Sequence, residues 1–287
     1  MNKLIYYIIQ KGIKKMGNWD KKIQLAIKAR EHTSKMSEEY SDDIKSSITN
    51  SIIFTGDGDN IGTSRLYDGR YRYNIEHRYD NIEFVVSNKY SSDAIMDAIE
   101  DGVTVLNFAS YKHPGGMFID GSSAQEETLC HDSFLYNVLS SNELRSYYAY
   151  NNMHLNKGLY SDRAVFSPDI LFFNSEGSKR CNVITCAAPN NSLSERYGAF
   201  SKDDNNAAML QRIAFLRVVA DRANDAKLHD RIILGAWGCG VFKQDYEFVL
   251  SNLLKEFSKS TYKIVEFALP DKKMFNYLNE IIRGGNN

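Results

Sequence analysis

The sequence predicts an α/β protein in which helices cover both faces of a central, mixed and largely parallel sheet. From about residue 52 onward, short apolar runs rich in β-branched and aromatic residues alternate with amphipathic segments. This alternation is typical of a three-layer α/β/α sandwich. Two glycine-rich loops, each directly after an apolar run, favour the same class, because open α/β sheets bind ligands at the carboxyl ends of their strands.

The expected elements follow from the local patterns. A strand at residues 82–86, a helix at 93–99 and a strand at 103–108 have the spacing of a β-α-β unit, which predicts that the two strands form a parallel pair. Residues 191–204 are polar, and we expect a mobile loop there. The other expected strands are 52–54, 169–173, 182–186, 231–234 and 263–268, and the other expected helices are 128–140, 206–226, 248–257 and 273–283.

An N-terminal helical extension is predicted over residues 1–50, with the α/β domain over residues 51–287. Apolar residues recur at helical spacing from Leu4 to Met16. Residues 1–35 carry nine Lys or Arg against two acidic residues, an excess that would attract a polyanion. The same charges equally suit a solvated helix face, and both interpretations stay open.

Residues 56–80 hold two motifs with alternative interpretations. The acidic loop at 56–62 superficially resembles a calcium loop but lacks the later glycine and the terminal glutamate. Further on, tyrosines alternate with arginines between Arg65 and Tyr79, a pattern that suits base stacking or an ordinary edge strand.

Composition fits one large domain without metal or cofactor. The chain has 287 residues, 43% of them hydrophobic, and a net charge of −1 that gives no overall attraction to nucleic acid or anionic membranes. The four cysteines and six histidines have no metal-ligand spacing, and no disulfide framework or thiol nucleophile is expected. The apolar run at residues 4–9 is too short to span a membrane. We therefore expect a cytoplasmic monomer.

The two glycine loops are the best candidates for a ligand site. The first, Pro-Gly-Gly-Met at 114–117, follows the strand at 103–108, and the second, 235–240, follows the strand at 231–234. Glycine lets the backbone approach a ligand, and its free N–H groups suit a diphosphate. Each loop alone also fits a tight turn, but two such loops at the ends of strands of one sheet favour ligand binding.

A pair of adjacent carboxylates, Glu126 and Glu127, begins a helix ten residues after the first glycine loop. Acidic residues in the first turn stabilise a helix through its dipole and need no chemical role. The glycine loop, however, would place a phosphate or sugar beside them. One glutamate would then hold the ligand while the other acts as an acid.

Together these residues resemble the signature of the microbial poly(ADP-ribose) glycohydrolases, a branch of the macrodomain superfamily. The resemblance extends over roughly residues 45–285. It rests on 105–110 (Val-Leu-Asn-Phe-Ala-Ser), 114–116 (Pro-Gly-Gly), 124–127 (Ala-Gln-Glu-Glu), 133–136 (Ser-Phe-Leu-Tyr) and 235–242 (Gly-Ala-Trp-Gly-Cys-Gly-Val-Phe).

The resemblance implies a macrodomain that hydrolyses the ribose–ribose O-glycosidic bond of poly(ADP-ribose) and releases ADP-ribose. Its partners would be the polymer or ADP-ribosylated macromolecules. It implies that Glu127 is the general acid and base and that Glu126 holds the ribose hydroxyls. The ligand-binding residues that it implies are Asn107, Gly115, Gly116, Met117, Gln125, Gly235, Gly238, Cys239, Gly240, Val241 and Phe242.

Two departures from the family pattern leave alternatives open. Met117 stands where the family has a third consecutive glycine, and residues 88–90 contain no acid where macrodomains often hold the adenine amine. A binding module in which Met117 blocks the reactive position, and a hydrolase of single ADP-ribose units, are the two alternatives.

Overall fold

The computed structural model describes residues 18–56, 66–68, 82–100, 102–198, 200–227 and 229–284. The N-terminal apolar stripe, most of the acidic loop and most of the tyrosine–arginine alternation lie outside the described residues. The helices are α2 (Asn18–Glu39), α3 (Ser41–Asn50), α4 (Ser91–Asp97), α5 (Gln125–His131), α6 (Leu135–Leu139), α7 (Arg145–Met153), α8 (Asn191–Tyr197), α9 (Lys202–Lys227), α10 (Tyr246–Phe257) and α11 (Lys272–Gly284), with 3₁₀ turns η1 (Phe118–Asp120) and η2 (Asn156–Gly158). The strands are β1 (Ile52–Thr55), β2 (Leu66–Asp68), β3 (Glu83–Ser87), β4 (Val103–Phe108), β5 (Arg163–Phe173), β6 (Ser178–Cys186), β7 (Arg231–Leu234) and β8 (Ile264–Ala268).

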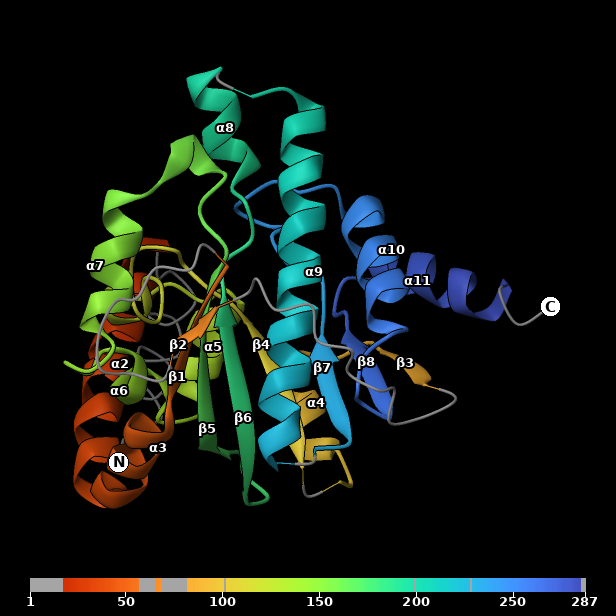
Figure 1. The fold of residues 1–287 in the computed structure, drawn as a ribbon. Coiled ribbons are helices and arrows are strands. Elements are labelled where there is room, and N and C mark those ends of the chain that lie inside the picture. The colour runs from red at the N-terminus through yellow and green to blue at the C-terminus, as the bar shows by residue number, and fades with distance from the viewer. Residues whose placement is uncertain are drawn as a thin grey trace, which may run out of the picture.

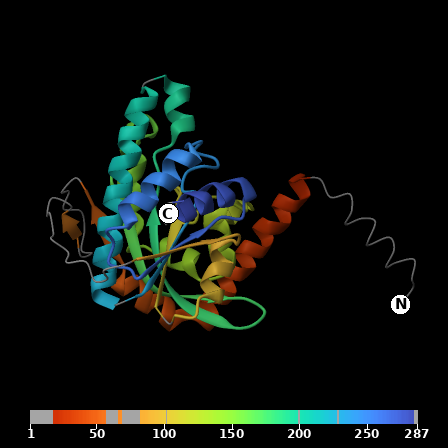
Figure 2. The same cartoon turned by 90° about the vertical axis from the view of Figure 1, so that its right-hand side faces the viewer.

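One mixed sheet forms the middle layer, with strand order β2-β1-β5-β6-β4-β7-β8-β3. Only the pairs that β5 forms with β1 and β6 are antiparallel. Helices α9, α10 and α11 cover one face and the helices from α2 to α7 lie on the other (Figure 1). Figure 2 shows α2 and α9 on opposite sides of the sheet. The predicted three-layer fold with an N-terminal helix is confirmed.

Side-chain alternation along the central strands divides the core between the two faces. Leu106 and Ile232 belong to the cluster under α9 and α10. Their neighbours in sequence, Val105 and Ile233, belong to the cluster under α5 and α6. A strand that is buried on both faces has a continuous run of apolar residues in its sequence. For this reason β4 and β7 were recognisable in the sequence.

The predicted pairing of the strands at 82–86 and 103–108 is wrong. β3 pairs with β8, and β4 pairs with β6 and β7, so β7 and β8 separate the two strands of the expected unit. Local spacing shows that a crossover connects two parallel strands, but it does not show how many strands lie between them.

The predicted loop at 191–204 is also wrong, because α8 and the first turn of α9 occupy it. The side chain of Asn190 caps α8 by accepting the N–H of Leu193 at 3.0 Å, and Gly198 ends the helix with φ 56°. The helix expected at 128–140 is two helices, since Ser133 pairs with Phe172 of β5 between them. Helix α7 was not predicted at all.

Helix α2 packs against the segment that follows the first glycine loop. Gly121 has φ 82°, and a Cβ there would overlap the carbonyl oxygen of Lys22 in α2. His32 of α2 also bonds the carbonyl oxygen of Ser133 at 2.7 Å. The N-terminal helix therefore contacts the body of the domain beside the candidate site. Among the described residues, no helix has the length and apolar character needed to cross a membrane.

Candidate active site

Both glycine loops begin at the same edge of the sheet. β4 and β7 are adjacent parallel strands, and the loops at 114–117 and 235–240 follow their carboxyl ends. Helix α5, which carries the two glutamates, starts beside them. The prediction that two strands of one sheet present these loops together is confirmed.

Gln125 joins α5 to the end of β4. Its Oε1 accepts the N–H of Phe108 at 2.8 Å, and its Nε2 donates to the carbonyl oxygen of Leu106 at 2.9 Å. The amide thus bonds β4 as a neighbouring strand would. A second bond from Nε2 to Ser91 Oγ, at 3.2 Å, ties in the start of α4. Gln125 therefore determines where the following two carboxyl groups lie.

Glu126 is buried and holds a proton at neutral pH. Its Oε1 accepts from Asn107 Nδ2 at 3.2 Å and its Oε2 accepts the N–H of Ser110 at 2.6 Å. The side chain is only 4% exposed, and this burial, together with the nearby Glu127 carboxyl, raises the pKa of Glu126 to about 8. Asn107 Oδ1 has no hydrogen-bond partner among the described residues. A buried acceptor in this state suits a ligand hydroxyl.

Glu127 is held by two backbone N–H groups from the segment around it. Its Oε1 accepts from Met117 at 2.9 Å, and its Oε2 accepts from Ala124 at 3.0 Å. Gly116, with φ 62°, makes room for both carboxyl groups, since a Cβ there would overlap Glu127 Oε1 and lie 2.9 Å from Glu126 Oε2. Both carboxyl groups therefore lie against the same side of Gly116, where a side chain would point.

Two N–H groups of the first glycine loop are bonded within the domain. The N–H of Gly116 donates to the carbonyl oxygen of His113, and that of Met117 donates to Glu127 Oε1. The N–H of Phe118, the next residue, donates to the carbonyl oxygen of Gly115. Gly115 has φ 64° and lets Tyr136 approach, with 2.7 Å between a Cβ there and Tyr136 Cδ2. What the structure shows for these glycines is close packing around the carboxyl pair. Their predicted contact with a diphosphate stays a prediction.

Met117 does not need the conformation that glycine permits. Its φ is −107°, within the range of ordinary residues, and its side chain is 42% exposed. Its N–H donates to Glu127 Oε1, and its carbonyl oxygen accepts the N–H groups of Asp120 and Ser122, each at 3.1 Å. A methionine at this position is therefore compatible with the loop and with the carboxyl pair.

The second glycine loop leaves consecutive backbone donors free. Within the described part of the chain, the N–H groups of Gly240, Val241 and Phe242 donate to no other group. Gly238, with φ 78°, lets the loop lie on Ala188 and Gln244, and Gln244 anchors the loop by donating to the carbonyl oxygen of Pro189 at 2.7 Å. Three adjacent free donors form a suitable site for an anion.

The remaining residues of this loop have structural contacts. Trp237 is buried and donates its Nε1 to the carbonyl oxygen of Cys186 at 3.0 Å. Gly235 lets the loop lie against Phe108, whose Cζ would be 2.9 Å from a Cβ there. Burial raises the pKa of the Cys239 thiol to about 12, so this thiol is protonated and unreactive. Among the described residues, no group of His, Cys, Asp and Glu side chains could hold a metal ion.

Two connected pockets run from β8 to the second glycine loop. The Asp271 pocket, of about 250 Å³, has walls that include Tyr90, Ser91, Phe108, Leu269, Asp271 and Met274. The Phe242 pocket, of about 260 Å³, includes Phe108, Gln125, Gly238, Gly240, Val241 and Phe242. Both are lined by Phe108, Ala124, Gln125 and Ala236, so the two pockets adjoin, and together they are called the groove below. Ala124 and Gln125 immediately precede Glu126.

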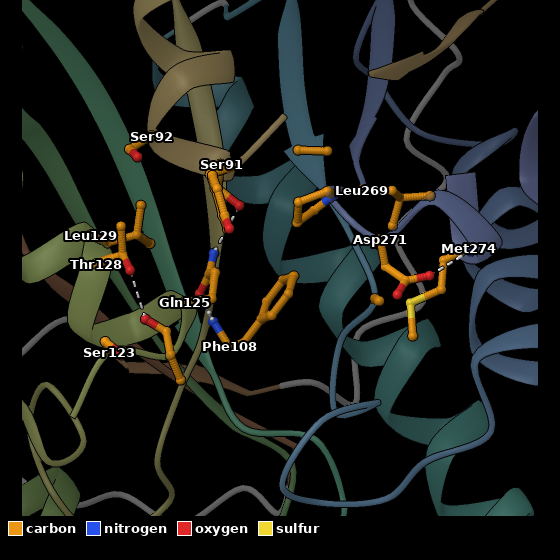
Figure 3. Close-up of a pocket in the computed structure, with 15 residues that line it drawn as sticks. Ser91, Ser92, Phe108, Ser123, Gln125, Thr128, Leu129, Leu269, Asp271 and Met274 are labelled. Atoms are coloured by element: carbon orange, nitrogen blue, oxygen red, sulfur yellow. Dashed lines mark hydrogen bonds between the residues drawn. The ribbon is translucent and has the colours of Figure 1, made fainter. Parts of the chain in front are cut away.

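Asp271 was missed in the sequence because it lies far along the chain from the recognisable motifs. It is the only carboxylate that lines its pocket, which Figure 3 shows between Ser91, Gln125 and Phe108 on one side and Leu269, Asp271 and Met274 on the other. Its Oδ1 caps α11 by accepting the N–H groups of Lys273 and Met274 at 2.9 and 3.1 Å. An aspartate at the start of a helix signals a cap and gives no hint of a pocket.

Asn88, in the position where an acid was expected, holds the segment that leads to Asp271. Its Nδ2 donates to the carbonyl oxygens of Leu269 and Pro270 at 2.8 and 3.0 Å. An aspartate there could not donate these bonds. The carboxylate of this pocket is therefore Asp271, in the segment after β8. Asn88, directly after β3, holds that segment in place.

A mixed sheet with this strand order and a groove at the ends of its central strands defines an α/β protein of the macrodomain-like fold. The catalytic domain of microbial-type poly(ADP-ribose) glycohydrolases (PARG) matches residues 24–175, more than half of the chain, and the chain belongs to that family.

Solved structures of bacterial members have the same fold. PARG from Thermomonospora curvata is 24% identical, with a TM-score of 0.71, and the match covers 90% of this chain and 98% of that one. The structure of the same enzyme bound to the inhibitor ADP-HPD is also 24% identical, with a TM-score of 0.69. That match covers 90% of this chain and 99% of the other. PARG from Deinococcus radiodurans in complex with ADP-ribose is 23% identical, with a TM-score of 0.69. The match covers 84% of this chain and 97% of that one. No curated protein matches the chain.

Proposed function

We propose that this chain hydrolyses ribose–ribose O-glycosidic bonds in poly(ADP-ribose) and releases ADP-ribose. The observation that carries the proposal is the carboxyl pair packed against Gly116, in which burial raises the pKa of Glu126 to about 8, together with free backbone donors in the glycine loop after the adjacent strand. The relative from Deinococcus radiodurans binds ADP-ribose, which supports the same ligand here.

The diphosphate would bind the N–H groups of Gly240, Val241 and Phe242. The distal ribose would then lie toward the carboxyl pair, with one hydroxyl donating to the unpartnered Asn107 Oδ1. Glu126 would hold the ribose hydroxyls. Because its pKa is raised to about 8, Glu126 brings a proton to the reaction at neutral pH.

The reaction would proceed through a ribose cation. Glu127 takes up the proton of the pair and delivers it to the leaving ribose oxygen as the C1–O bond breaks. The oxocarbenium-like ribose is stabilised by the neighbouring diphosphate. Glu127, now a carboxylate, removes a proton from water, whose oxygen bonds C1 and completes the hydrolysis. One carboxyl group thus serves as acid and base, unlike the usual two-carboxylate glycosidase.

The purine would lie in the Asp271 pocket. Phe108, Leu269 and Met274 provide apolar walls, and Asp271 keeps Oδ2 available because its two cap bonds are made by Oδ1. Asp271 Oδ2 would accept a hydrogen bond from the exocyclic amine of adenine.

The test is ADP-ribose release from poly(ADP-ribose) by the wild type, Glu127→Gln and the control Glu143→Gln, which changes an exposed glutamate. We expect release by the wild type, a fall of about a hundredfold or more in Glu127→Gln, as loss of general acid catalysis implies, and no change in the control. Calorimetric binding of ADP-ribose by Glu127→Gln should persist.

The same experiment separates two other functions. A binding module would bind ADP-ribose but release none in either form, and Met117→Gly would then test whether the methionine is responsible. A hydrolase of single ADP-ribose units would act on a singly modified protein and leave the polymer intact. Absence of both binding and release would refute the proposal and these alternatives together.

A further inference from the structure

The segment between α7 and β5 contains an unusual backbone conformation close to the groove. Asn156, Lys157 and Tyr160 have φ values of 41°, 48° and 61°, in the left-handed region that residues other than glycine seldom adopt. For a bulky aromatic residue this conformation is unfavourable, and it persists only when surrounding contacts impose it. The contacts of Tyr160 therefore indicate which interactions hold it in this conformation.

The Tyr160 ring lies between two aromatic residues from distant parts of the chain. It stacks on Tyr111 with ring centroids 4.1 Å apart and 8° between the planes. It also meets Phe242 edge to face, with a centroid distance of 6.2 Å and an angle of 67°. Tyr160 itself is 8% exposed and does not line the Phe242 pocket. Its ring meets the lining of the groove at Phe242.

Hydrogen bonds hold the two tyrosines in place. The Tyr160 hydroxyl accepts from Asn190 Nδ2 at 3.3 Å, and the N–H of Asn190 donates to Gly158 at 2.7 Å. The Tyr111 hydroxyl accepts the N–H of Ser161 at 3.1 Å. These bonds connect the strained segment to the start of α8 and to the loop after β4.

The start of α8 also holds the second glycine loop. The N–H of Ser192 donates to the carbonyl oxygen of Phe242 at 3.2 Å, and Asn191 Nδ2 donates to that of Lys243 at 3.3 Å. Phe242 is thus fixed at its backbone by α8 and at its ring by Tyr160. Because the N–H of Phe242 is one of the free donors, the position of this residue determines the shape of the anion site.

We propose that Tyr160 is a positioning residue for the ligand groove: supported by Tyr111, its ring holds Phe242 where it contacts the bound ADP-ribose. This rests on the proposed function for the identity of the ligand. Tyr160 acts on ligand affinity and has no contact with the carboxyl pair, so its loss raises KM and leaves kcat nearly unchanged.

Two variants separate the ring from the hydroxyl. Tyr160→Phe keeps the ring and should bind ADP-ribose as the wild type does. Tyr160→Asn keeps a residue that tolerates positive φ but removes the ring. Its Kd and KM should rise by about threefold to tenfold, the factor that corresponds to loss of one aromatic pair. Tyr160→His, which retains a smaller ring and also tolerates this backbone, should give an intermediate Kd if Tyr160→Asn does not fold.

A control variant tests whether loss of any stacked tyrosine has this effect. Tyr150 in α7 stacks on His154 with centroids 3.8 Å apart, and neither residue lines the groove. Tyr150→Asn should lower the melting temperature without changing the Kd for ADP-ribose. An equal rise in Kd for Tyr150→Asn and Tyr160→Asn would overturn the inference.

A double-mutant cycle shows whether Tyr160 acts through Phe242. If it does, Tyr160→Asn has little further effect on the Kd in a Phe242→Leu background, and the two substitutions are non-additive. Additive effects, or an unchanged Kd in Tyr160→Asn alone, would refute the positioning role. A wild type that binds no ADP-ribose would instead refute the proposed function, so calorimetry distinguishes the two failures.

Discussion

The buried proton of Glu126 predicts how the stability of this protein depends on pH. An unfolded glutamate has a pKa of 4.5, whereas burial in the native state raises the pKa of Glu126 to about 8. Between these values the native protein keeps a proton that the unfolded chain has lost, so the free energy of unfolding falls as the pH rises. The stabilisation is complete below about pH 4.5 and lost above about pH 8.

Glu126→Gln removes this titration while keeping the shape of the side chain. One pKa unit corresponds to about 1.4 kcal/mol, so the rise from 4.5 to about 8 is worth on the order of 5 kcal/mol over the whole window. The glutamine oxygen can still accept the N–H of Ser110. Its NH₂ group would replace the oxygen that accepts from Asn107 Nδ2, so the Asn107 amide must turn over to accept through Oδ1, which has no partner among the described residues. The variant should therefore fold, and its stability should vary much less with pH.

Urea unfolding of the wild type and of Glu126→Gln at a series of pH values between about 5 and 8.5 measures how the free energy of unfolding of each depends on pH. We expect the free energy of unfolding of Glu126→Gln, relative to the wild type, to increase by on the order of 4 kcal/mol toward the alkaline end. For Glu143→Gln, which changes an exposed glutamate, the free energy of unfolding should depend on pH as it does in the wild type. Parallel curves for Glu126→Gln and the wild type would show that Glu126 titrates normally, and would refute the assignment of the buried proton.

Two further predictions concern the loop and the pocket. Gly116→Ala places a Cβ against Glu127 Oε1 at φ 62°, so thermal unfolding should show a loss of about 2–3 kcal/mol and ADP-ribose release should stop. Gly240→Ala, where a Cβ meets nothing within 4 Å, is the stability control, and an equal loss there would contradict the packing argument. Asp271→Asn keeps the cap of α11, but calorimetry should show about tenfold weaker binding of ADP-ribose. The hypoxanthine analogue, which lacks the amine, should be unaffected, and equal losses for both ligands would contradict the assignment of Asp271.

The elements that the sequence predicted well are those whose signal is local. The apolar runs that became β4 and β7 were recognisable because both faces of these strands are covered. The carboxyl pair at the start of α5 and the glycines before it were equally visible, since backbone freedom and helix-end preferences depend on a few neighbouring residues. Helix α8 escaped because its sequence is polar, although Asn190 and Gly198 are an ordinary cap and terminator.

The sequence by itself determined which residues are candidates for the site: two carboxyl groups, a glycine loop before them and a second glycine loop after another strand. Only the tertiary structure decided where they stand. It places β7 directly beside β4, so that the two glycine loops follow adjacent strands, and it brings Asp271 into a pocket that adjoins the pocket of the second loop. The tertiary structure also raises the pKa of Glu126, because that pKa depends on burial by residues from many parts of the chain. Strand order and burial are sums over long-range contacts, which no local pattern records.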